Sequence, residues 1–191
     1  MRPGPWLAGA AIIAALALLG RGLSRRTPEA LGRAEARVKL ATLREILAKR
    51  GDNDPRLDRD FVALTPETKA LLREEYRSYP AERRNERGTI VYLLGNNLKT
   101  PEDWAFLRDV AAEPPCLSLA DCSKPSGEPG ELGDEITLAY PSLVAVRQAA
   151  RAAREGGSKE GALSVLSAAR ASRVAAVTRL ARTIDAGSTA R

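Results

Sequence analysis

The tripeptide Thr-Pro-Glu occurs three times, at residues 27–29, 65–67 and 100–102, and each copy precedes an apolar pattern with helical spacing. Threonine caps the exposed amide groups of a helix, proline fits the first helical position, and glutamate favours the positive end of the helix dipole. No stretch of the sequence alternates polar and apolar residues as a half-buried strand would. We therefore expect an all-α fold.

The spacing of the apolar residues predicts where the helices lie. We expect helices over residues 28–49, 66–78, 81–95, 101–112, 135–154 and 159–185. The run Gly95-Asn96-Asn97 is typical of a left-handed helix end. Residues 113–133 combine prolines, glycines and acidic side chains, which predicts an irregular loop within the helical region.

The stretch NERGTIVYLLGNNLKTPEDWAFLRDVAAEPP, residues 85–115, resembles one unit of the HEAT-like α-solenoid proteins. In such units one helix ends in a Leu-Gly pair, here Leu94-Gly95, and the next begins with an apolar run. The resemblance extends over residues 56–112. It implies a short array of helical hairpins that presents a binding surface. An irregular helical bundle is the alternative, because the chain supplies only two or three units.

The first 26 residues are expected to lie outside the helical domain of residues 27–191. Residues 6–20 carry no charge, and arginines bracket them on both sides. This pattern favours a transmembrane anchor that extends through Leu23, or a signal sequence. We favour an uncleaved single-pass anchor over a removed signal peptide, because Ala15-Leu16-Ala17 lies inside the apolar run rather than after it.

The two cysteines, Cys116 and Cys122, lie six residues apart in the predicted loop. Their spacing allows an easily closed disulfide, and such bonds persist in oxidising compartments. We therefore expect a Cys116–Cys122 disulfide and an extracytoplasmic helical domain. The arginines after the apolar segment favour the cytoplasmic face instead, and cleavage of the segment would give a secreted protein.

The chain contains no histidine, which removes the commonest general base and metal ligand. The acidic cluster around Asp52, Asp54, Asp58 and Asp60 lacks the glycine and glutamate positions of a calcium-binding EF-hand loop. Interleaved arginines favour a solvated, neutralised loop there. Glu82 and the arginines beside it indicate a polar helix face. We therefore predict no catalytic, cofactor-binding or metal-binding residues and no cofactor.

Charge is segregated along the chain, since residues 101–140 carry 2 Lys/Arg against 9 Asp/Glu. Together with the helical hairpins, this pattern favours a non-enzymatic, membrane-tethered scaffold that binds a protein partner. One alternative is a carboxylate-dependent envelope hydrolase that uses Asp58 or Asp60 with Glu67.

The second alternative is a lipid- or nucleic-acid-binding module built on the predicted basic helix 159–185. That helix has an apolar seam formed by Leu163, Leu166, Val177, Leu180 and Ile184. Nucleic acid is disfavoured as a partner, because no aromatic residue is interleaved with the arginines of this helix.

Membrane fractionation tests the predicted anchor. We expect the full-length protein to remain in the membrane fraction after high-salt and carbonate washing, because residues 6–23 supply an apolar segment that salt does not release. Release of the full-length chain into the soluble fraction would contradict the anchor.

Overall fold

The computed structural model describes residues 28–51, 53–125 and 133–188, and all regular structure within them is helical. The helices are α2 (Pro28–Ala48), α3 (Arg56–Asp60), α4 (Pro66–Ser78), α5 (Arg84–Gly95), α6 (Pro101–Ala111), α7 (Glu135–Leu138), α8 (Tyr140–Arg154), α9 (Lys159–Arg170) and α10 (Ala175–Ser188). The all-α prediction is thus confirmed for these residues. The predicted anchor at residues 1–26 lies outside them. None of the helices described here is long and apolar enough to cross a membrane.

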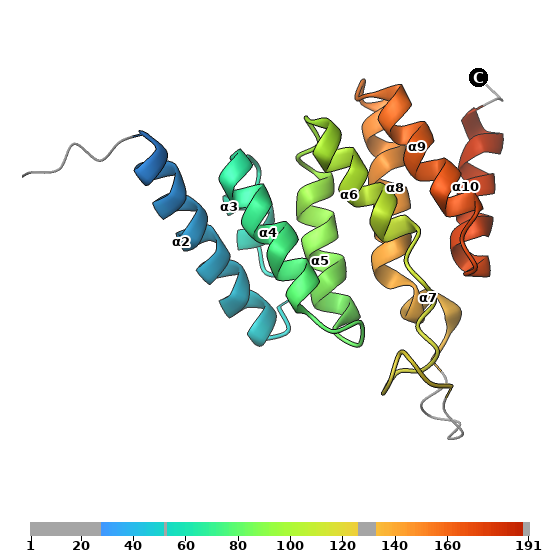
Figure 1. Ribbon diagram of the computed structural model, residues 1–191. Helices are drawn as coiled ribbons and strands as arrows, with labels where there is room; N and C mark the ends of the chain where they lie inside the picture. Colours follow the sequence, from blue (N-terminus) through green and yellow to red (C-terminus); the bar gives the residue numbers. More distant parts are fainter. Residues whose placement is uncertain (1–27, 52, 126–132, 189–191) are drawn as a thin grey trace, which may run out of the picture.

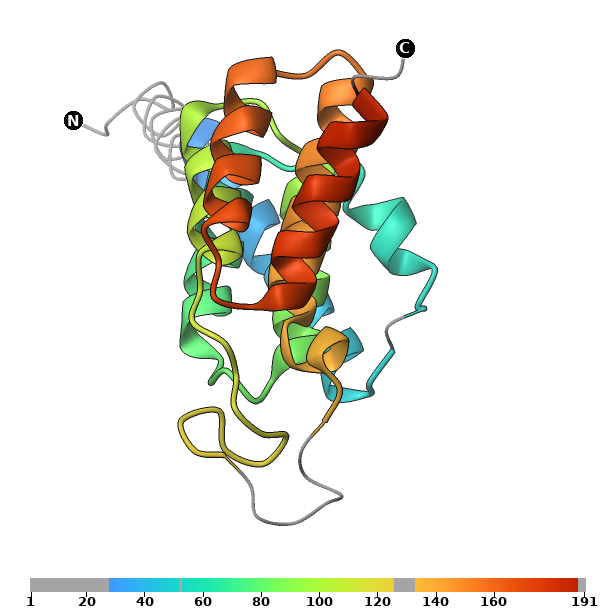
Figure 2. The same ribbon diagram turned by 90° about the vertical axis from the view of Figure 1, so that its right-hand side faces the viewer.

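The helices lie side by side in a row that runs from α2 at one end to α10 at the other (Figure 1). They pair as α4 with α5, α6 with α8, and α9 with α10. Neighbouring pairs pack through α5 against α8 and through α6 against α9. In the view along the row, α6 and α9 lie on one side and α8 and α10 on the other (Figure 2). Buried apolar side chains form one cluster from Leu43 in α2 to Ala181 in α10.

Glycines in α5 and α9 allow neighbouring helices to approach closely. A Cβ atom on Gly88 of α5 would overlap the ring of Tyr140 in α8, and one on Gly161 of α9 would overlap the indole of Trp104 in α6. Because protein interiors are close-packed, a larger residue at either position would force the helices apart.

The predicted start signals at residues 65–67 and 100–102 begin α4 and α6. The hydroxyl of Thr65 accepts a hydrogen bond from the N–H of Thr68 at 3.2 Å. At α6 the carboxylate of Asp103 accepts the N–H of Thr100 at 3.0 Å. The first bond satisfies an N–H group in the first turn of α4, and the second satisfies the N–H group of the residue that caps α6. Thr27 lies outside the described residues, so the cap predicted there stays a prediction.

Asp103 also forms a buried ion pair that joins α6 to α4. Its Oδ2 atom lies 2.6 Å from Nζ of Lys69, and its Oδ1 atom lies 3.0 Å from Nη1 of Arg73. Only 2% of the Asp103 side chain and 5% of the Lys69 side chain are exposed. Burial opposes ionisation of Asp103, but the bonds from Lys69 and from the N–H groups of Lys99 and Thr100 outweigh it and lower its pKa.

The single helix predicted over residues 159–185 is wrong, because the chain turns between α9 and α10. The hydroxyl of Ser172 accepts the N–H of Val174 at 3.2 Å, and this local bond competes with helical continuation. The predicted apolar seam is therefore divided between two helices. Leu163 of that seam is 58% exposed, whereas Val177 is fully buried.

The left-handed helix end predicted at Gly95-Asn96-Asn97 is also wrong, since Asn96 has a φ of −71°. The side chain of Asn97 closes this end instead. It donates to the carbonyl oxygen of Leu93 in the last turn of α5 at 3.0 Å. It also accepts the N–H of Leu64 at 3.0 Å and donates to the carbonyl oxygen of Phe61 at 3.1 Å. The helix before it, α5, begins at Arg84 rather than at residue 81.

Substitution of Asp103 tests the ion pair. We expect Asp103→Asn to lower the free energy of unfolding by about 3–5 kcal/mol, because Lys69 then carries a buried charge without its counter-ion. Urea titration followed by circular dichroism measures the change. Asp109→Asn on the same helix is the matched control, because the Asp109 side chain is 69% exposed. Equal effects of the two substitutions would show that the buried pair has no special role.

Candidate functional site

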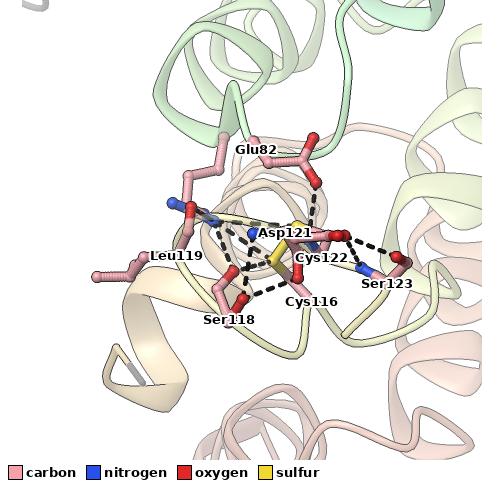
Figure 3. Close-up of a disulfide and its surroundings, with 8 residues drawn as sticks. Glu82, Cys116, Ser118, Leu119, Asp121, Cys122 and Ser123 are labelled. Carbon is pink, nitrogen blue, oxygen red and sulfur yellow. Dashed lines mark hydrogen bonds between the residues drawn. A yellow bond between two sulfur atoms is a disulfide. The ribbon is translucent and has the colours of Figure 1, made fainter. Parts of the chain in front are cut away.

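The loop that follows α6 is closed by the predicted disulfide, with the sulfur atoms of Cys116 and Cys122 2.00 Å apart (Figure 3). Hydrogen bonds within the loop fix its shape. The N–H of Leu117 donates to the carbonyl oxygen of Cys122 at 3.1 Å. The hydroxyl of Ser118 donates to the carbonyl oxygen of Asp121 at 2.8 Å and accepts the N–H of the same residue at 3.1 Å. Ser118 is only 2% exposed, so the loop has a small polar core of its own.

Two charged side chains from the α4–α5 corner and the start of α5 brace this loop. The carboxylate of Glu82 accepts the N–H of Cys122 at 2.7 Å (Figure 3), and this bond lowers the pKa of Glu82. Nη2 of Arg84 donates to the carbonyl oxygens of Ser118 and Leu119, each at 3.2 Å. The sequence indicated a polar helix face at these residues. That interpretation is incomplete, because Glu82 and Arg84 bind the loop.

The sequence gives no signal for this brace. Glu82 lies 40 residues before Cys122, and Arg84 lies 32 residues before Cys116. Their local pattern is that of ordinary charged residues at a helix start. Only the packing of the α4–α5 pair beside α6 brings them to the loop.

A cavity of about 420 Å³ lies beside the disulfide. The residues that line it include Cys116, Cys122, Arg87, Glu113 and Leu138. Oε1 of Glu113 accepts bonds from Nη2 of Arg87 at 2.7 Å and from the hydroxyl of Tyr76 at 2.8 Å. Burial raises the pKa of Glu113, although both partners favour its charged form. The cavity thus combines apolar walls with one charged pair.

The same end of the molecule exposes apolar side chains. Leu117 in the loop is 43% exposed, and Ile136 in α7 is 61% exposed. The loop and α7 meet at Gly133, which has a φ of 61°, and a Cβ atom there would lie 2.8 Å from Leu119. Glycine is therefore required at this junction, and it brings α7 against the loop.

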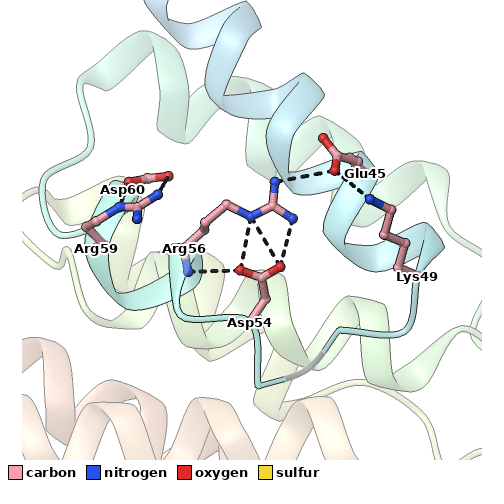
Figure 4. Close-up of polar contacts among 6 residues, drawn as sticks. All are labelled: Glu45, Lys49, Asp54, Arg56, Arg59 and Asp60. Atoms are coloured by element: carbon pink, nitrogen blue, oxygen red, sulfur yellow. Dashed lines mark hydrogen bonds and ion pairs between the residues drawn. The ribbon is translucent and has the colours of Figure 1, made fainter.

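Two carboxylates of the acidic cluster after α2, Asp54 and Asp60, are paired with arginines (Figure 4). Asp54 Oδ2 lies 2.7 Å from Nη2 of Arg56, and Asp60 Oδ1 lies 2.6 Å from Nε of Arg59. Asp58 accepts the hydroxyl of Tyr92 at 3.0 Å. Asp52 lies outside the described residues, and those described contain no group of three or more potential metal ligands.

The aromatic residues that a glycan-binding cleft would need are dispersed. Trp104 is 8% exposed and packs at the contact of α6 with α9, and Tyr76 is 3% exposed. Tyr79 lines the cavity beside the disulfide, whereas Tyr92 binds Asp58. Of these four aromatic residues, Tyr92 is the one that lies next to a carboxylate named for the hydrolase alternative, and its hydroxyl is bonded to Asp58.

The sequence and the fold were compared with known families, curated proteins and solved structures. No family model, curated protein or solved structure matches the chain. The resemblance of residues 56–112 to HEAT-like proteins therefore stays a prediction, and function is inferred from the geometry of the loop and its neighbours.

The pH dependence of stability tests the neutralised cluster. Side-chain bonds from Arg56, with a bond from its N–H, lower the pKa of Asp54 from 3.8 to about 2. Because the folded-state pKa is the lower one, ionised Asp54 stabilises the fold above about pH 4, and this contribution disappears as pH falls toward 2. We expect Asp54→Asn to lower the thermal midpoint at neutral pH, with a difference that shrinks below pH 4. A difference that stays constant down to pH 2 would contradict the ion pair.

Proposed function

We propose that this chain is a non-enzymatic, membrane-tethered helical scaffold, and that the loop of residues 113–125 with α7 is its docking element for a protein partner. The observation that carries the proposal is the bracing of the disulfide-closed loop by Glu82 and Arg84. A loop cross-linked and pinned in this way loses little conformational entropy when a partner binds.

Exposed apolar side chains on fixed elements support a protein as the partner. Leu117 and Ile136 expose apolar surface to solvent, at 43% and 61%. Glu82 anchors the loop that carries Leu117, and bonds that Glu135 accepts from α10 anchor α7. Apolar side chains that pack into a partner's pocket contribute most of the binding energy of many interfaces. The surrounding polar groups then exclude water rather than add affinity.

The charge of the segment favours a partner with a basic surface. Residues 101–140 carry 2 Lys/Arg against 9 Asp/Glu, although Asp103 is buried in the fold and Glu113 pairs with Arg87. Charge complementarity of this kind accelerates association and selects between partners more than it raises affinity. We therefore expect capture to weaken as ionic strength rises.

The arrangement of the helices and the disulfide also support a HEAT-like array and an extracytoplasmic location. The side-by-side helical pairs agree with a HEAT-like array, in which stacked hairpins present extended surfaces. The disulfide agrees with an oxidising, extracytoplasmic location. Residues 6–23 would supply the membrane tether in this arrangement.

Site-specific photo-crosslinking tests the docking element. A photoreactive amino acid at position 117 of the full-length protein in membranes is expected to cross-link one protein species. The matched control is position 163, because Leu163 is also apolar and exposed, at 58%, but lies on α9. The same products from both positions, or none from position 117, would contradict the docking element.

Affinity gives a second measurement once the cross-linked partner is identified. We expect Leu117→Glu to weaken its binding at least about tenfold, as removal of an interface anchor does, and Leu163→Glu to leave it unchanged. Equal weakening by both substitutions would show that binding does not involve the loop.

A further inference from the structure

The guanidinium of Arg84 lies against the disulfide. Its Nη2 atom is 3.3 Å from Sγ of Cys116 and 3.9 Å from Sγ of Cys122. The carbonyl oxygens of Ser118 and Leu119 hold the same nitrogen in place. A cation next to a sulfur atom stabilises the thiolate form of a cysteine. Arg84 therefore favours negative charge on Cys116, the nearer of the two.

Of the other charges around the disulfide, Glu82 offsets part of this effect, because its carboxylate also interacts with Arg84. Two nearby carboxylates have cations of their own, namely Asp121 with Lys124 at 3.2 Å and Glu113 with Arg87 at 2.7 Å. Glu82, from the α4–α5 corner, binds the backbone N–H of Cys122 at 2.7 Å. Its negative charge disfavours a thiolate on Cys122. The surroundings thus distinguish the two sulfur atoms electrostatically.

The disulfide is open to small reagents. Both cysteines are partly exposed, and both line the cavity of about 420 Å³. That volume lies within the range of pockets that hold small molecules. A disulfide that serves only to hold a fold is typically resistant to reduction, whereas accessible bonds are the exchangeable ones.

We propose that Cys116 and Cys122 form a thiol–disulfide exchange site, which small thiols reach through the cavity and in which Arg84 stabilises Cys116 as the leaving thiolate. The inference does not depend on the partner-binding function, because it concerns the sulfur atoms and not the exposed surface of Leu117. It also does not require the Cys-x-x-Cys spacing of thioredoxin-type redox sites, because the charge of Arg84 acts on the leaving group directly.

The exchange proceeds in two steps. A thiolate attacks Sγ of Cys122, a bond forms between these two sulfurs, and the Cys116–Cys122 bond breaks with its electron pair moving to Cys116. A second thiolate then attacks the sulfur of the bound thiol and releases Cys122, which takes a proton from water. Two thiolates are oxidised to one disulfide, and the protein disulfide is reduced to the Cys116 thiolate and the Cys122 thiol.

Alkylation of the reduced protein tests the role of Arg84. In full-length protein in detergent, we expect the pH midpoint for alkylation of Cys116 to lie below about 8.5, the value of an ordinary cysteine, and below that of Cys122. Arg84→Gln should raise the Cys116 midpoint by about one pH unit, whereas Arg84→Lys, which keeps the charge, should keep it low. Peptide mass spectrometry separates the two cysteines.

Arg83→Gln is the matched control, because Arg83 is adjacent in sequence but pairs with Glu86 at 2.7 Å. It should leave the Cys116 midpoint unchanged. An ordinary midpoint for Cys116 in the wild-type protein would overturn the proposal, and this measurement needs no variant. Equal shifts from Arg83→Gln and Arg84→Gln would overturn it as well.

Reaction of the oxidised protein with glutathione tests the direction of attack. We expect a mixed disulfide on Cys122, and slower formation of it in Arg84→Gln, because a poorer leaving thiolate slows exchange. Preferential adduct formation on Cys116, or no reaction in the folded protein, would contradict the proposal.

Discussion

The buried carboxylate of Asp103 is the constraint on which the position of the loop depends. It accepts two backbone N–H groups around the start of α6 and pairs with Lys69 and Arg73 of α4. A buried charge is tolerated only where hydrogen bonds and counter-ions replace its lost hydration. The one carboxylate therefore caps α6, neutralises Lys69 and holds α4 beside α6. Because α4 leads directly to Glu82 and α6 leads directly to Cys116, the same contact brings the brace to the loop.

The sequence predicts those helices best whose ends have strong local signals. The start of α4 was predictable from Thr65 and Pro66, and the start of α6 from Thr100 and Pro101, because cap and proline act within a few residues. The turn between α9 and α10 was missed, because it depends on a weak side-chain bond of Ser172 amid good helix formers. The role of Asn97 was missed because its partner Phe61 is 36 residues away.

In the candidate site, too, the features that depend on nearby residues were predictable, and those that depend on distant residues were not. The disulfide was predictable from the spacing of the only two cysteines in a loop. The brace from Glu82 and Arg84 was not, because charged residues at the start of a helix usually face solvent and nothing local marks an exception. The cavity was equally inaccessible to sequence reasoning, since its lining residues come from segments that meet only in the folded chain.

Arg84 connects the structural and the chemical roles of the loop. It donates to the carbonyl oxygens of Ser118 and Leu119 as well as contacting both sulfurs, and Glu82 holds the N–H of Cys122 independently of the disulfide. Reduction therefore removes the covalent closure but leaves the anchors on Ser118, Leu119 and Cys122 in place. Leu117, next to Cys116, then keeps the bond from its N–H to the carbonyl oxygen of Cys122 but loses the covalent link beside it. A redox change at the sulfurs is thus expected to act on the exposed apolar residue while the helical packing stays as it is.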